Sequence, residues 1–250
     1  MITLFSFNLT YLQLALFVLV GLFIGLSKTG IHGAGMAAVP ILALIFGGKM
    51  SSGILLPILS IADIFAVWHY NRHAQWSHLM KLFPFAAIGV VLGTFVGAFI
   101  NDESFRLIMG FIIIISLVVM IWMEKSNKKS IPQSMWFAAV LGIAGGFTTM
   151  VGNLAGTVMA LYLLSMRLPK NEYIGTAAWF FMIINLFKVP FHIFFWETIN
   201  WNTFKLDLLT IPAVALGAFL GISIVKKIPE HKYRWFIIGM TIVSALLLVI

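Results

Sequence analysis

Hydrophobic residues along the chain form ten long runs, which are interrupted by charged residues or by glycine-rich stretches. A helix needs about 20 apolar residues to cross a bilayer, and most of the runs approach that length. The runs cover residues 9–27, 33–47, 52–70, 79–100, 105–123, 132–149, 153–166, 173–196, 203–225 and 233–250. This pattern predicts an all-α integral membrane protein.

Two of the runs, 33–47 and 153–166, are short for a straight crossing. Each follows a full-length run across a glycine-bearing break, at residues 25–35 and 146–156. The short runs could span the membrane, return as re-entrant hairpins, or form the second half of one broken helix. The sequence leaves these three arrangements open.

Composition supports the membrane assignment. Of 250 residues, 61% are hydrophobic and 10% are charged, and the mean hydropathy is +1.04. Soluble domains are about 45–50% apolar and about 25% charged, so the composition excludes a soluble enzyme, a disordered chain and a nucleic-acid binder. Residues 1–11 contain no Lys or Arg and no small-residue cleavage site follows the first run, so we expect no cleaved signal peptide.

Basic residues are distributed unevenly among the connections. Twelve of the 16 lie in odd-numbered connections and three lie in even-numbered ones, which is a strong positive-inside bias. We therefore expect a multi-pass protein of the inner (plasma) membrane. The polar linker 124–131 would be cytoplasmic, and both termini would lie outside.

The two halves of the chain share a pattern of small residues. A shift of 121 residues places four positions on identical residues: Gly21, Gly25, Ala34 and Gly35 fall on Gly142, Gly146, Ala155 and Gly156. A shift of 128 residues does the same for five later positions: Pro84, Ala87, Gly89, Leu92 and Gly93 fall on Pro212, Ala215, Gly217, Leu220 and Gly221. We predict one membrane repeat in residues 1–123 and a second in residues 132–250. Five segments per repeat is an odd number, so the repeats would be inverted, as in many secondary transporters.

The two breaks are the main candidates for a substrate site, because broken helices in equivalent halves mark the binding sites of such transporters. Exposed N–H groups at a helix N-terminus favour anions. The candidate donors are one cation, several hydroxyls, an amide and backbone N–H groups at glycines, and no carboxylate is among them. The first break provides Ser27, Lys28, Thr29, His32 and Gly33, and the second provides Thr148, Thr149, Gly152 and Asn153. This set suits a small oxyanion, with Lys28 as the compensating charge. Alternatively, the glycines serve helix packing and Lys28 marks the cytoplasmic interface.

Two further charges lie within predicted spans. Asp63 is near the middle of its segment, where a carboxylate is costly, so it either binds a coupling proton, pairs with a lysine or holds a structural hydrogen bond. Lys188 lies about 12 Å from the outer end of its segment at 1.5 Å per residue. It either snorkels to the surface or provides a second charge that attracts anions.

Other chemistry is weakly represented. The chain has no cysteine, and it lacks the H-E-x-x-H and G-x-S-x-G patterns. His69 and His73 could share a helix face, but they have no carboxylate or thiol partner, so we expect neither a metal nor another cofactor. Trp68, Trp76, Trp122, Trp136, Trp196 and Trp201 lie near predicted span ends, where tryptophan anchors helices at the membrane interface.

Residues 21–40 (GLFIGLSKTGIHGAGMAAVP) resemble the opening motif of the TauE/SafE family of sulfite exporters. The segment 152–156 (GNLAG) and the stretch around Asn185 and Lys188 are similar to the family's second repeat. The resemblance implies transport of small sulfur oxyanions or organosulfonates.

The sequence therefore predicts a secondary transporter, not an enzyme, that exports a small anion between the two breaks. Its partners would be the anion and the lipid bilayer, with a proton as one candidate for coupling, and without nucleic acid. A homodimer is one assembly that the sequence leaves open. The alternative is a polytopic membrane protein without transport activity, such as an assembly subunit or a membrane enzyme.

Overall fold

Nearly all described residues of the computed structural model are helical, as the sequence predicts. The structure describes residues 2–31, 34–101, 103–104, 107–108, 111, 115, 118, 135–233, 235–237 and 239. The predicted linker 124–131 lies outside the described residues, and so do most of the runs 105–123 and 233–250. A small hairpin, which the hydropathy pattern did not indicate, pairs β1 (Ile2–Leu4) with β2 (Phe7–Leu9).

The first half contains α1 (Tyr11–Lys28), η1 (Ala34–Ala37), α2 (Ala38–Phe46), α3 (Gly48–Tyr70), η2 (Asn71–His73) and α4 (Trp76–Phe99). Thr10 and Gln13 form a capping box that begins α1. The chain leaves α1 through Gly30, whose φ of 126° is a conformation that favours glycine.

The second half contains α6 (Met135–Gly152), α7 (Ala155–Ser165), α8 (Lys170–Phe194), α9 (Trp201–Leu208) and α10 (Ile211–Lys227). The apolar run 203–225 is divided into two helices, because α9 and α10 meet at a bend of 50°, and the pair together is long and apolar enough for one span. Proline lacks the N–H that a helix interior needs and is tolerated in a first turn, so Pro212 favours a new helix that begins at Ile211.

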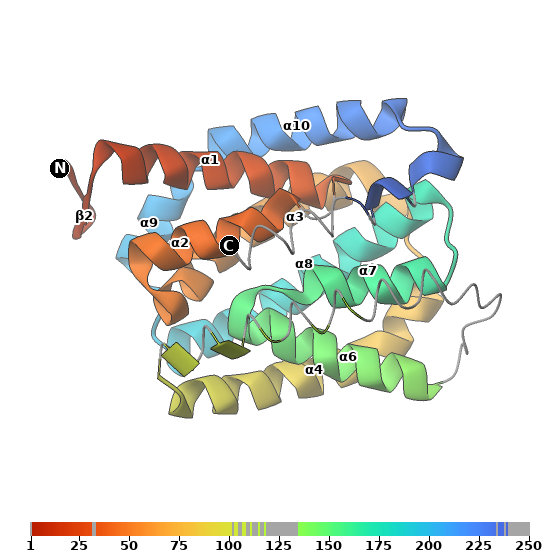
Figure 1. The fold of residues 1–250 in the computed structure, drawn as a ribbon, viewed down its shortest axis with the longest axis horizontal. Helices are drawn as coiled ribbons and strands as arrows, with labels where there is room; N and C mark the ends of the chain where they lie inside the picture. The colour runs from red at the N-terminus through yellow and green to blue at the C-terminus, as the bar shows by residue number, and fades with distance from the viewer. Residues whose placement is uncertain are drawn as a thin grey trace.

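The short helices return along the direction from which the chain came. In Figure 1, α2 runs back beside α1, and α7 runs back beside α6. With 9 and 11 residues, α2 and α7 are too short to cross a bilayer by themselves. This excludes a straight continuation through either break and favours the re-entrant arrangement. Within the described residues, five single helices and the bent pair of α9 and α10 are long and apolar enough to span a membrane.

The closest helix pairs are α1 with α10 and α4 with α6, and glycine permits both contacts. A Cβ atom on Gly25 would lie 2.2 Å from the Val214 carbonyl oxygen, and one on Gly146 would lie 2.0 Å from the Ala86 carbonyl oxygen. The interpretation that these glycines serve helix packing is therefore confirmed.

The two contacts also correspond to each other in the sequence. Gly25 and Gly146 are 121 residues apart, and their partners Ala86 and Val214 are 128 residues apart. These are the two shifts of the sequence repeat. The same correspondence holds for the contacts of Gly217 with Leu22 and of Gly89 with Ile143. Inversion of the halves stays a prediction.

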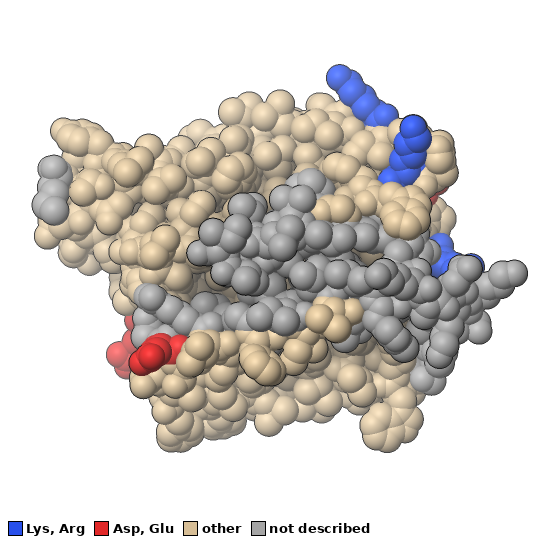
Figure 2. All heavy atoms as spheres, viewed as in Figure 1, with Lys and Arg blue, Asp and Glu red and all other residues tan. Residues whose placement is uncertain are grey.

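The outer surface is largely apolar, as expected of a protein that is surrounded by lipid. Large apolar side chains are exposed on several outer helices, for example Leu44, Phe99 and Phe219. On the face drawn in Figure 2, Lys and Arg side chains gather at one end and acidic side chains lie at the other.

Of the predicted interfacial anchors, four tryptophans are exposed as expected: Trp68, Trp76, Trp136 and Trp201. Trp196 is not an anchor of this kind, because it is 7% exposed and its Nε1 donates to the Thr94 carbonyl. Trp122 lies outside the described residues.

Candidate functional site

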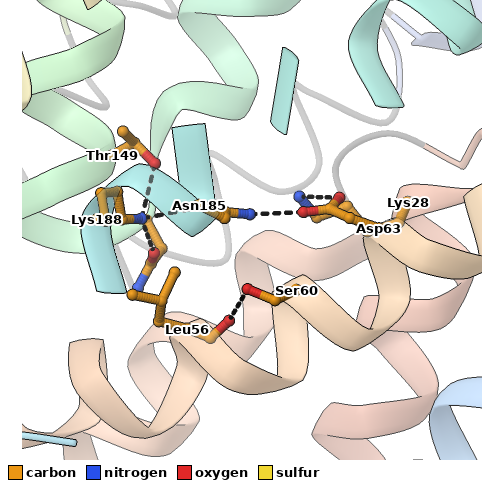
Figure 3. A network of polar contacts seen from close by, with 8 residues as sticks. Lys28, Leu56, Ser60, Asp63, Thr149, Asn185 and Lys188 are labelled. Atoms are coloured by element: carbon orange, nitrogen blue, oxygen red, sulfur yellow. Dashed lines mark hydrogen bonds and ion pairs between the residues drawn. The ribbon is translucent and has the colours of Figure 1, made fainter. Parts of the chain in front are cut away.

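A continuous line of polar side chains joins α1, α3 and α8 inside the helical bundle (Figure 3). At one end, Lys28 Nζ lies 2.9 Å from Asp63 Oδ1 and 4.1 Å from the centroid of the Phe181 ring. The Lys28 side chain is 10% exposed and the Asp63 side chain is fully buried. Of the interpretations of Asp63, pairing with a lysine is confirmed, whereas the role in coupling stays a prediction.

Asn185 continues the line from the ion pair toward Lys188. Its Nδ2 donates to Asp63 Oδ2 over 2.7 Å, and its Oδ1 accepts from Lys188 Nζ over 3.2 Å. A single amide thus donates to the acidic group and accepts from the basic one. Asn185 and Lys188 are three residues apart on α8, so both face the bundle interior.

Lys188 forms the other end of the line. Its Nζ donates to Asn153 Oδ1 over 2.6 Å and to Thr149 Oγ1 over 3.1 Å, in addition to Asn185. The residue is fully buried and is directed inward, so it does not snorkel to the surface. Within the described part of the chain, Lys188 has no carboxylate at ion-pair distance.

The second break brings its residues to Lys188. α6 ends at Gly152, and Asn153 adopts a φ of 57°, a conformation that asparagine tolerates better than most residues. The Asn153 side chain is held by α3, because its Nδ2 donates to the Ser52 carbonyl over 3.0 Å and lies 3.3 Å from Ser52 Oγ. α7 then begins at Ala155 without a side-chain cap.

The remaining predicted residues are divided among other roles. Thr29 Oγ1 donates to the carbonyls of Gly25 and Ala218, which ties α1 to α10. Thr148 Oγ1 donates to the Gly145 carbonyl within its own helix. Ser27 lies beside Gly35, where a Cβ atom would be 2.9 Å from Ser27 Oγ. His32 and Gly33 lie outside the described residues.

Sequence reasoning missed two members of the polar line, Asn185 and Ser52, as site residues. The signal for Asn185 was its spacing of three residues from Lys188, which places both side chains on one helix face. Ser52 carried no such signal, because its contact with Asn153 joins residues 101 positions apart.

The charges along this line do not balance. Lys28 and Asp63 neutralise each other, whereas the described neighbours of Lys188 are a hydroxyl and two amides. A buried charge without a counter-charge is costly, so the end of the line at Lys188 would be stabilised by a negatively charged ligand.

Fold and surface together define a multi-pass α-helical membrane protein with a buried polar centre at a helix break. A comparison with protein families then identifies the particular group. The family model described as Sulfite exporter TauE/SafE matches residues 17–248, which is nearly the whole chain, so the protein belongs to this family. Membership indicates a membrane transporter of sulfite-type anions and agrees with a protein that is not an enzyme. No curated protein and no solved structure matches the chain.

Proposed function

We propose that the protein is a secondary transporter that exports small anions such as sulfite or organosulfonates, and that it binds the anion at the second break beside Lys188. The observation that carries this proposal is the fully buried Lys188 side chain, which has no carboxylate partner among the described residues. A small oxyanion would supply the missing charge.

The second break offers suitable donors. Lys188 Nζ would exchange one of its present acceptors for an anion oxygen, and the Thr149 hydroxyl would turn to donate. The uncapped start of α7 follows Asn153, and N–H groups at a helix N-terminus favour a negative charge. Hydrogen bonds that involve a charged group contribute about 1.5–3 kcal/mol each, so a few of them can replace the hydration of a small anion in part.

The first break has a different part in this proposal. Lys28 is already paired with Asp63 and covered by the Phe181 ring, so the pair holds α1 against α3. We therefore place the anion at Lys188 and not at Lys28. Thr29 is left out of the proposed site as well, because its hydroxyl bonds the backbone of α1 and α10.

The proposed orientation follows the charges at the two ends. Lys170 Nζ bonds the Val225 and Ile228 carbonyls, which places the start of α8 and the end of α10 at the same end of the molecule. This basic end would face the cytoplasm, and α9 with the N-terminal hairpin would lie outside. Because the chain has no cysteine, labelling of Lys226→Cys from inside and of Asn202→Cys from outside tests the orientation. The reverse pattern would reject it.

Anion flux in liposomes that contain only this protein tests the function. Sulfite, thiosulfate and sulfoacetate are the substrates to compare, with Lys188→Met as the variant and Lys205→Met, on outer helix α9, as the control. We expect flux of at least one anion with the wild type and the control, and at least a ten-fold loss in Lys188→Met. Absence of flux with every anion would favour the alternative of a membrane protein without transport activity.

A further inference from the structure

His192 lies one helical turn beyond Lys188 on α8, and one of its ring nitrogens has no partner. Its Nδ1 is 2.8 Å from Thr198 Oγ1. Its Nε2 is buried and forms no hydrogen bond with any described residue. Buried polar atoms are nearly always paired, so an orphaned imidazole nitrogen beside a buried lysine requires an explanation.

The surroundings of His192 connect it to the second break. Thr198 packs on Gly53 of α3, where an added Cβ would lie 2.4 Å from the Thr198 side chain. The preceding residue, Ser52, accepts hydrogen bonds from Asn153, which in turn accepts from Lys188. Residues i and i+4 of a helix share a face, so Lys188 and His192 border the same region between α8 and the start of α3.

Trp196 encloses the histidine from the outer end. Its ring lies 4.9 Å from the His192 ring in an edge-to-face arrangement, and its Nε1 is fixed by the Thr94 carbonyl. Lys49 Nζ lies 5.4 Å from the centroid of the Trp196 ring. The indole ring therefore lies close to both the His192 ring and the Lys49 ammonium.

Charged and titratable groups around this end of α8 are few. α8 itself provides Lys188, and α3 provides Lys49 and, about four turns further along, Asp63. The segment after α8 provides the exposed Glu197, and α9 provides Lys205 and the buried Asp207. α6 has no charged or histidine residue, α7 has only Tyr162 as a titratable group, and the titratable residues of α4 lie in its first two turns, far from Thr94. Among the described residues, no carboxylate lies at ion-pair distance from His192.

We propose that His192 binds a proton together with the transported anion, and that it therefore belongs to the anion site. The proposal rests on the function proposed above. A proton can enter this buried region at low cost only when a negative charge accompanies it. The neutral imidazole takes one proton from water as the anion binds, and it returns that proton to water when the anion leaves.

The charges then predict which anions suit the site. Lys28 and Asp63 cancel, Lys188 balances one negative charge, and protonated His192 balances a second. The site accepts a monoanion with His192 neutral and a dianion with His192 protonated. Because sulfite and its singly protonated form differ by this one charge, both would be bound.

Proton uptake by purified wild-type protein tests the proposal without any transport. Sulfite, and separately the dianion thiosulfate, is added in weakly buffered detergent solution while binding and pH are both recorded. We expect about one proton to be taken up per thiosulfate bound by the wild type. Binding without proton uptake would overturn the role of His192 and leave the proposed function intact. Failure of every tested anion to bind would reject the proposed function and this proposal with it.

Variants then assign the proton to a residue. His192→Gln keeps a hydrogen-bond donor but cannot titrate, and we expect it to bind thiosulfate at least ten-fold more weakly without proton uptake. The exposed His231→Gln is the matched control and should behave as the wild type. Asp63→Asn and Asp207→Asn test the two fully buried carboxylates among the described residues. Proton uptake that is retained in His192→Gln would overturn the proposal, and loss of uptake in either carboxylate variant would then assign the proton to that carboxylate.

Discussion

The two helix breaks are embedded in equivalent packing but differ in their chemistry. Each follows a long helix whose glycines contact the third long helix of the other half, which is α10 for α1 and α4 for α6. Yet Lys28 at the end of α1 corresponds, at the shift of 121, to the neutral Thr149 of α6, and Asp63 faces Asn185 across the pair of α3 and α8. The comparison teaches that the two halves share the same helix packing but not the same polar groups. The first half contains an ion pair between Lys28 and Asp63, whereas Lys188 in the second half has no carboxylate partner among the described residues.

The largest expected effect comes from breaking the ion pair in the first half. Lys28→Met leaves the Asp63 carboxylate buried without its partner, and the free energy of unfolding should fall by about 3–5 kcal/mol. The double variant Lys28→Met/Asp63→Asn removes both charges, keeps an acceptor for Asn185, and should recover most of the loss. Detergent-based unfolding of the single and double variants measures this. Equal stability of wild type and Lys28→Met would show that the pair contributes nothing to the frame.

Substitution of the contact glycines by alanine should lower the stability by a similar amount in the two halves. Gly25→Ala and Gly146→Ala each place a Cβ within about 2.2 Å of a backbone oxygen. The helices must separate, at a cost of about 1–3 kcal/mol of stability per variant. Gly156→Ala is the control, because no described atom lies within 4 Å of its added Cβ, and it should change stability by less than about 1 kcal/mol. A large loss in one half alone would contradict the equivalence of the two packing contacts.

A smaller effect is expected from the side chain that orients Lys188. Asn153→Gly keeps the φ of 57° accessible but removes the acceptor of the shortest Lys188 hydrogen bond. One hydrogen bond of about 1 kcal/mol corresponds to roughly a five-fold weaker anion affinity, measurable by calorimetry. Asn153→Ala should also lose stability, because alanine resists a positive φ. Tighter anion binding in Asn153→Gly would mean that Asn153 competes with the anion.

Much of the frame could be predicted from sequence, because span length and glycine spacing are local properties of the chain. The breaks and the glycines at the helix contacts follow from such patterns. The burial of Lys188 does not, because the sequence left open whether this side chain snorkels to the surface. The contact between Lys28 and Asp63 could not be predicted in this way, because hydropathy does not show which faces of two helices pack against each other. The same reason explains the missed Ser52 and the buried Trp196. The bend between α9 and α10 had a local signal in Pro212, which lies inside the predicted run 203–225.

The most direct test compares the two lysines under conditions in which neither variant leaves an unpaired carboxylate. Anion affinity is measured by calorimetry for Lys188→Met and for the double variant Lys28→Met/Asp63→Asn, with sulfite and thiosulfate. Our account predicts at least a ten-fold loss of affinity in Lys188→Met, which corresponds to about 1.4 kcal/mol or more. It predicts a change of less than about three-fold in the double variant. Unchanged affinity in a folded Lys188→Met, with a loss in the double variant, would contradict the account and move the anion to the first break.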